Sequence, residues 1–127
     1  MTTPFAEVSK ARYLLLTTFT KDGRPKPTPI WAATDGDRLL VITEEDSWKV
    51  KRIRHTPRVT LAACDMRGNP RSEAVEATAA ILDKSETDNV YAAIGQRYGI
   101  VGKVFNLVSR LRGGRARNVG LELKAAN

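Results

Sequence analysis

Tight turn signals divide residues 13–43 into short β-prone runs, and this division constrains the fold more than any other feature of the sequence. Tyr13–Thr20 is apolar and β-branched and ends at Lys21-Asp22-Gly23, while Arg38–Thr43 follows Asp35-Gly36-Asp37. Runs of this length and composition predict strands, and the Asp-Gly signals predict hairpin turns between them. We therefore expect antiparallel strands rather than a parallel sheet with long crossovers.

The run between these two turns, Lys26–Ala33, contains Pro27 and Pro29. Proline has no backbone N–H and is tolerated in strands mainly at sheet edges or bulges. The sequence therefore predicts three consecutive antiparallel strands, with the middle one partly unpaired and free to face something else.

A short helix is expected at Trp48–His55, opened by Glu44–Ser47 and ended by Thr56-Pro57. Further strands are expected at Arg58–Asp65, Glu73–Leu82 and Val119–Lys124, with helices at Glu86–Tyr98 (capped by Ser85) and Ile100–Leu111, and a loop at Arg112–Asn118. The pattern predicts a mainly β (α+β) domain over residues 1–127, a small barrel of about six antiparallel strands with two or three helices.

Basic residues exceed acidic ones, with 21 Lys and Arg against 14 Asp and Glu and a net charge of +7. The excess lies in two stretches, from Lys49 to Arg71 and from Lys103 to Arg117. Such stretches predict an anionic partner: nucleic acid, a membrane surface or an anionic small molecule. A solvated basic surface without a partner is the plainer alternative.

Side chains suited to catalysis or metal binding are scarce. Cys64 and His55 are the only residues of their kinds, which excludes a disulfide framework or a Cys/His zinc site within one chain. Glu44–Asp46 could bind a metal, but a solvated turn explains it better, so no metal site is predicted. No apolar run is long enough to span a membrane, and a lone cysteine suits a reducing cytoplasm. Any redox chemistry would then depend on a bound cofactor.

The order of residues in Tyr13–Thr43 and Asp46–Asp65 resembles the flavin/deazaflavin oxidoreductase superfamily, the split β-barrel group that includes pyridoxamine 5′-phosphate oxidase-like proteins. It is most similar to the mycobacterial, actinobacterial type that uses the deazaflavin coenzyme F420. The sharpest element is Thr43, Ser47–Arg54 and Pro57-Arg58-Val59. Family members often carry Asn and Leu where this chain has Arg52 and Ile53.

The resemblance implies an FMN-binding split barrel in which Lys49 contacts the cofactor phosphate and the ring lies along the strand at Thr28–Trp31. Ser47, near the helix start, could donate to the same phosphate, since free N–H groups there favour anions. Core or interface packing remains an alternative role for Trp31, and surface packing for Trp48. The expected cofactor-binding residues are Thr28, Pro29, Ile30, Trp31, Thr43, Ser47, Trp48, Lys49, Lys51, Arg52 and Arg54.

The function implied is an F420H2-dependent reductase that passes hydride to a small organic acceptor, with water or Tyr98 as possible proton sources. Lys51, Arg52 and Arg54 supply more charge than one FMN phosphate needs, which favours F420 over FMN. The alternatives are an FMN-dependent oxidoreductase and a non-catalytic protein that sequesters a cofactor. We also expect a cytoplasmic homodimer with cofactor sites at its interface, and neither a nucleic-acid nor a membrane partner.

Overall fold

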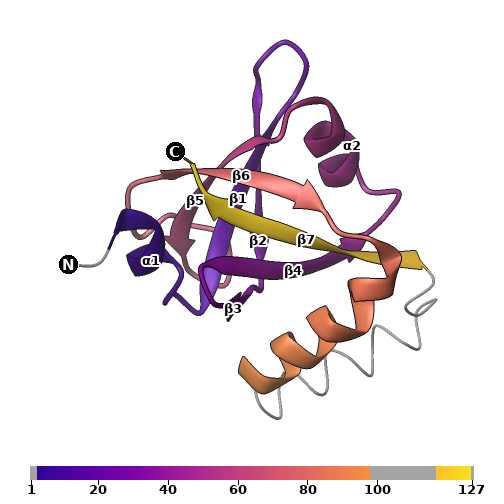
Figure 1. Cartoon of the computed structure of the whole chain (residues 1–127). Coiled ribbons are helices and arrows are strands. Elements are labelled where there is room, and N and C mark those ends of the chain that lie inside the picture. Colours follow the sequence, from indigo (N-terminus) through magenta and orange to yellow (C-terminus); the bar gives the residue numbers. More distant parts are fainter. Residues whose placement is uncertain (1–2, 98–116, 127) are drawn as a thin grey trace.

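The computed structural model of the chain describes residues 3–97 and 117–126, and its strands form one curled sheet (Figure 1). The strands are β1 (Tyr13–Phe19), β2 (Pro25–Ile30), β3 (Ala33–Asp35), β4 (Arg38–Glu44), β5 (Arg58–Cys64), β6 (Val75–Ile81) and β7 (Asn118–Ala125). Across the sheet they follow the order β2-β1-β5-β6-β7-β4-β3, and each runs antiparallel to its neighbours. The predicted antiparallel, mainly β split barrel is confirmed.

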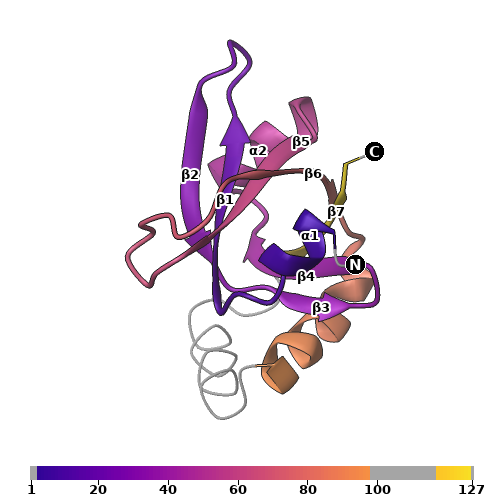
Figure 2. The same cartoon turned by 90° about the vertical axis from the view of Figure 1, so that its left-hand side faces the viewer.

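The two edge strands of this sheet, β2 and β3, are consecutive in the chain and are joined only by Trp31 and Ala32. The sheet therefore curls until its edges approach without pairing, and β2 borders open space in Figure 2. The prediction of one strand over Lys26–Ala33 was wrong, because the chain leaves β2 after Ile30 to start β3. This break gives seven strands among the described residues instead of about six. The three consecutive strands predicted over residues 13–43 are antiparallel to their neighbours, but they do not all pair in chain order, since β4 pairs with β3 and β7 and not with β2.

Three helical segments accompany the sheet in the described part of the chain. They are α1 (Pro4–Val8), α2 (Trp48–His55) and a 3-10 turn at Lys84–Glu86 that leads into a helix over residues 87–97. The boundaries of α2 are those predicted. Sequence reasoning missed α1, and the cap before the third helix is Asp83, whose carboxylate accepts from Ser85 N at 2.9 Å. The helix predicted at Ile100–Leu111 and most of the Arg112–Asn118 loop lie outside the described residues.

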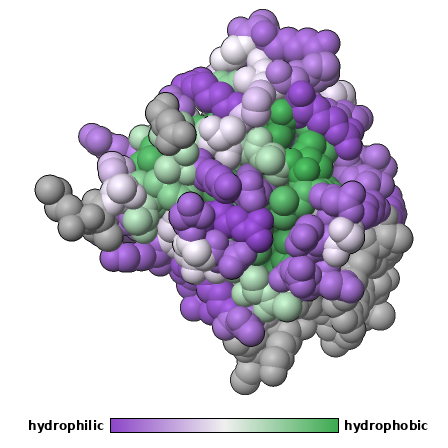
Figure 3. All heavy atoms as spheres, viewed as in Figure 1, coloured by the Kyte–Doolittle hydropathy of each residue, from purple (hydrophilic) through white to green (hydrophobic). Residues whose placement is uncertain are grey.

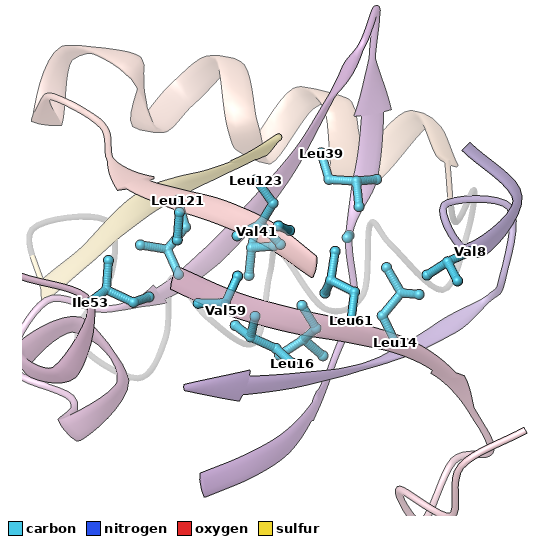
Figure 4. Packing of buried hydrophobic residues seen from close by; sticks show 14 of the residues in the cluster. Val8, Leu14, Leu16, Leu39, Val41, Ile53, Val59, Leu61, Leu121 and Leu123 are labelled. Atoms are coloured by element: carbon cyan, nitrogen blue, oxygen red, sulfur yellow. The ribbon is translucent and has the colours of Figure 1, made fainter. Parts of the chain in front are cut away.

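The main core fills the concave side of the sheet. Alternate residues of the strands point inward, and α2 covers one end with Val50 and Ile53 while α1 covers the other with Phe5 and Val8. Burying each such aliphatic or aromatic side chain contributes about 1.5–3 kcal/mol. The side chains labelled in Figure 4 are Val8, Leu14, Leu16, Leu39, Val41, Ile53, Val59, Leu61, Leu121 and Leu123.

A second, smaller cluster lies on the other face of β4, where Leu40 packs against Val90 and Ile94 of the helix over residues 87–97. The helix approaches β7 so closely that a Cβ built on Gly120 would lie 2.8 Å from Val90 Cγ2. A glycine in β7 is therefore what allows the helix to reach the sheet, and this packing brings Ile94 to the site described below.

The face seen in Figure 1 is mainly hydrophilic, and hydrophobic residues reach it in patches (Figure 3). Within the described residues, no helix has the length and apolar character needed to cross a membrane.

Candidate functional site

The exposed edge of β2 carries three prolines at alternate positions, and the ladder fixes which way their backbone groups point. Thr20 N donates to Arg24 O at 3.0 Å, so the next pair of the ladder, Phe19 and Pro25, is a pair that exchanges no hydrogen bonds. By the same alternation Pro27 and Pro29 face away from β1. The free edge therefore presents carbonyl acceptors and no N–H donors at Pro25, Pro27 and Pro29.

The start of α2 is fixed by Ser47, whose extended backbone and hydroxyl make it the N-cap. Ser47 Oγ accepts from Val50 N at 3.4 Å, which leaves the hydroxyl proton free to be donated. Thr43 Oγ1 lies 3.4 Å from the same Ser47 oxygen. Two of the predicted site residues thus form one hydroxyl pair at the junction of β4 and α2.

A cavity of about 250 Å³ lies beside this junction and joins β2, β4, α2 and the helix over residues 87–97. We call it the Lys49 cavity. It is lined by Pro29, Ile30, Trp31, Ile42, Lys49 and Ile94. The structure thus brings Lys49 to the strand that was predicted to hold the cofactor ring.

Lys49 itself is half-buried, and its pKa is lowered below the ordinary value. Burial is the larger cause, and the neighbouring charge of Arg52 adds to it, while Glu44 acts weakly in the opposite sense. No hydrogen-bond or ion-pair partner of the Lys49 ammonium is found among the described residues. A desolvated ammonium without a counter-ion favours an incoming anion.

The other cations of α2 share this lack of partners. Within residues 3–97 and 117–126, Lys51, Arg52 and Arg54 form no ion pair, whereas Arg38 binds Glu122 at 2.7 Å and Arg58 binds Glu76 at 2.6 Å. Arg38 and Arg58 are thus neutralised locally, whereas α2, which carries no acidic residue, keeps a net positive field.

The predicted site residues do not form one group, because Trp48, Lys51 and Arg52 lie on another side of α2. They line a separate pocket of about 380 Å³ with the end of the β1–β2 hairpin. Arg52 Nε donates to Thr18 Oγ1 at 2.7 Å, so the arginine that replaces the family's asparagine is tied to β1. The remaining predicted residues line neither hollow: Thr43 and Ser47 form the hydroxyl pair at the start of α2, Thr28 is half-buried in β2, and Arg54 is exposed.

Sequence reasoning missed two walls of the Lys49 cavity, Ile42 and Ile94. The position of Ile42 could have been predicted, because side chains alternate along β4 and Ile42 points to the opposite face from the inward-facing Leu39 and Val41. No local signal identifies Ile94, which reaches the cavity only through the packing of its helix on β4.

The curled antiparallel sheet with α2 at its end defines a split-barrel protein. The model of the pyridoxamine 5′-phosphate oxidase family matches residues 5–121, and the chain belongs to this family. A comparison with curated protein sequences found no match.

Solved structures confirm the fold at low sequence identity. A conserved hypothetical protein from Mycobacterium tuberculosis has a TM-score of 0.72 and 21% identity, over 100% of this chain and 82% of the other. A structure described as an F420 reductase has a TM-score of 0.64 and 20% identity, over 100% and 97%. The haem storage protein HutZ from Vibrio cholerae has a TM-score of 0.68 and 15% identity, over 96% and 87%.

Proposed function

We propose that this protein is an F420H2-dependent reductase of the mycobacterial type, which transfers hydride from the reduced deazaflavin to a small organic acceptor. The observation that carries the proposal is the Lys49 ammonium, which is half-buried beside β2 and has no partner among the described residues. Lys51, Arg52 and Arg54 of α2 also form no ion pair with any described residue. Several such cations suit a coenzyme with a phosphodiester and several carboxylates better than one with a single phosphate.

The residues present fit such a group. Lys49 would hold the phosphate, and the Ser47 hydroxyl, whose proton is not used in the helix cap, would donate to it. The outward carbonyls of Pro27 and Pro29 would accept from ring N–H groups and so orient the ring along the edge of β2. When bound, the reduced deazaflavin supplies a hydride. Trp31 and Ile42 would keep water from the ring's neighbourhood.

The Lys49 cavity is smaller than the roughly 300–1,000 Å³ of ordinary ligand pockets. It can enclose only part of a deazaflavin, so the remaining walls must come from elsewhere. This supports a homodimer with cofactor sites at the subunit interface, in which each protomer contributes part of every site. A cytoplasmic setting completes the proposal, and the unpaired, buried Cys64 is compatible with it.

Two alternatives deserve the same assay. FMN binds proteins of this class through one phosphate, which Lys49 alone would satisfy. The likeness to a haem storage protein makes a binding protein without turnover the second alternative.

The test is a parallel titration of the protein with F420 and FMN at low and high salt, followed by oxidation of F420H2 with a panel of conjugated acceptors. We expect tighter binding of F420, weakening with salt because exposed charges are screened within about 8–10 Å at 0.1–0.15 M, and turnover with at least one acceptor. Tighter FMN binding without a salt effect would overturn the cofactor assignment. Tight F420 binding without oxidation by any acceptor would favour the binding-protein alternative.

A further inference from the structure

We infer that the pocket between the β1–β2 hairpin and α2 is a second binding site, separate from the Lys49 cavity, for a small planar aromatic anion. We call it the Trp48 pocket. Its volume of about 380 Å³ is in the range of ordinary small-molecule sites. Its lining includes Phe19, Lys21, Trp48, Lys51, Arg52 and His55.

The indole of Trp48 is the first observation. It is 71% exposed, and among the described residues only Met66 is a comparably exposed large hydrophobic side chain. The ring adds nothing to the core, since α2 is anchored through Val50 and Ile53 instead. A large aromatic surface left open at the mouth of a pocket is typical of a ligand contact.

The charge around the ring is the second observation. Lys51 Nζ lies 4.6 Å from the centre of the Trp48 ring, so an ammonium is held beside the aromatic surface. Arg52 uses its Nε on Thr18, and its two terminal amino groups have no partner among the described residues. No carboxylate belongs to the part of the lining that the structure describes. The pocket can thus bind an anion and stack a flat ring at once.

Phe19 contributes to the hydrophobic part of the pocket. Arg58 lies over its ring, with the guanidinium carbon 4.5 Å from the ring centre, but Glu76 neutralises that arginine. The cations left for a ligand are therefore those of α2 and Lys21, whereas the charge of Arg58 is already satisfied.

The Trp48 pocket is distinct from the Lys49 cavity in position. Successive residues of a helix point about 100° apart, which separates Trp48 from Lys49. Along the β1–β2 ladder the pocket lies at the Phe19–Pro25 end and the cavity at the Leu14–Ile30 end. Five residues of strand span about 17 Å. The strand walls of the two hollows are therefore well separated, and the inference holds whether or not F420 binds in the Lys49 cavity.

The experiment uses Lys49→Met protein, so that a phosphate does not enter the Lys49 cavity, and calorimetric titration with defined probes. Adenosine 5′-monophosphate and 2-naphthoate carry a flat ring with a phosphate or a carboxylate, and comparison of the two tells which anion is preferred. Adenosine lacks the anion, while ribose 5-phosphate and cyclohexanecarboxylate lack the aromatic ring. We expect at least one aromatic anion to bind with a dissociation constant below about 1 mM, and its matched partial probes to bind at least tenfold more weakly.

Trp48→Ala should weaken that binding at least tenfold, because it removes the stacking surface. Met66→Ala is the matched control, since Met66 is equally exposed but lies in the β5–β6 turn, and it should change binding less than twofold. Equal binding of ringed and ringless anions would overturn the inference, as would an unchanged affinity in Trp48→Ala. If the Lys49→Met protein binds no probe and adding Trp48→Ala abolishes its self-association, the pocket is a subunit contact and not a ligand site. Failure of F420 to bind wild-type protein would contradict only the proposed function.

Discussion

Replacing Lys49 by methionine separates a binding role of this residue from a structural one. The change removes one charge and keeps an unbranched chain with similar helix propensity, so the packing of the lysine stem is largely retained. We expect two results that point in opposite directions, a loss of cofactor affinity and no loss of stability in the unliganded protein.

The loss of affinity follows from the lack of a protein partner for the Lys49 ammonium among the described residues. A hydrogen bond to a charged group contributes about 1.5–3 kcal/mol, which corresponds to a rise of roughly 10- to 150-fold in the dissociation constant. Calorimetric titration of F420 into wild-type and Lys49→Met protein measures it.

The stability result follows from the lowered pKa of Lys49, caused first by burial and then by Arg52. A lysine whose pKa is lower in the folded protein than in the unfolded chain opposes folding when protonated. That opposition is complete below the folded pKa and is relieved as the pH rises from that pKa toward 10.5. Methionine removes the charge, so the melting temperature of the unliganded variant at pH 7 should equal or exceed that of the wild type.

Lys51→Met is the matched control, because Lys51 is exposed, lies on the same helix and contacts the Trp48 ring instead of the cavity. An exposed charge contributes about 0.2–1 kcal/mol, so the affinity of the Lys51→Met protein for F420 should fall less than about fivefold. Wild-type affinity should also decline at alkaline pH as Lys49 loses its proton, and the Lys49→Met protein should lack that decline. Equal losses of F420 affinity in the two variants would refute the assignment of Lys49 as the phosphate contact. Unfolding of Lys49→Met with normal F420 affinity per folded molecule would also refute it.

Three further predictions concern assembly and stability. The protein should sediment as a dimer at micromolar concentrations, with F420 lowering the dimer dissociation constant; a monomer that binds one F420 per chain at full affinity would contradict this. Gly120→Ala should cost about 1–3 kcal/mol in denaturant unfolding, because its Cβ would press on Val90; unchanged stability would mean that Val90 turns aside. The Asp65 carboxylate accepts hydrogen bonds from the side chain and backbone of Asn69 and from Arg67 N. These bonds, those from Asn69 most of all, lower the pKa of Asp65 to about 2. Its stabilising effect is therefore present above about pH 4 and lost as the pH falls toward 2, and acid titration of Asp65→Asn should lack that part of the decline.

Local chemistry explains which elements were predictable. The boundaries of α2 are marked by a serine that can cap and by Thr56-Pro57, which cannot continue a helix. Gly23 and Gly36 adopt positive φ in the two hairpin turns, as their turn signals indicate. In contrast, the break at Trp31 follows no local rule, because it depends on which strands become neighbours once the sheet has curled.

The partners of the basic residues were the least predictable part of the site, and topology explains why. In the sequence, Arg38, Arg52 and Arg58 are equivalent cations. Pairing of β4 with β7 brings Arg38 to Glu122, 84 residues away, and pairing of β5 with β6 brings Arg58 to Glu76. Helix α2 instead packs its apolar side on β1 and β6, and the contact that Arg52 makes there is with the neutral hydroxyl of Thr18. The composition therefore predicts that an excess of positive charge exists. Strand register decides that Arg38 and Arg58 are neutralised, whereas among the described residues Lys51, Arg52 and Arg54 of α2, next to the edge strand that offers acceptors to a ligand, keep their charge without an ion pair.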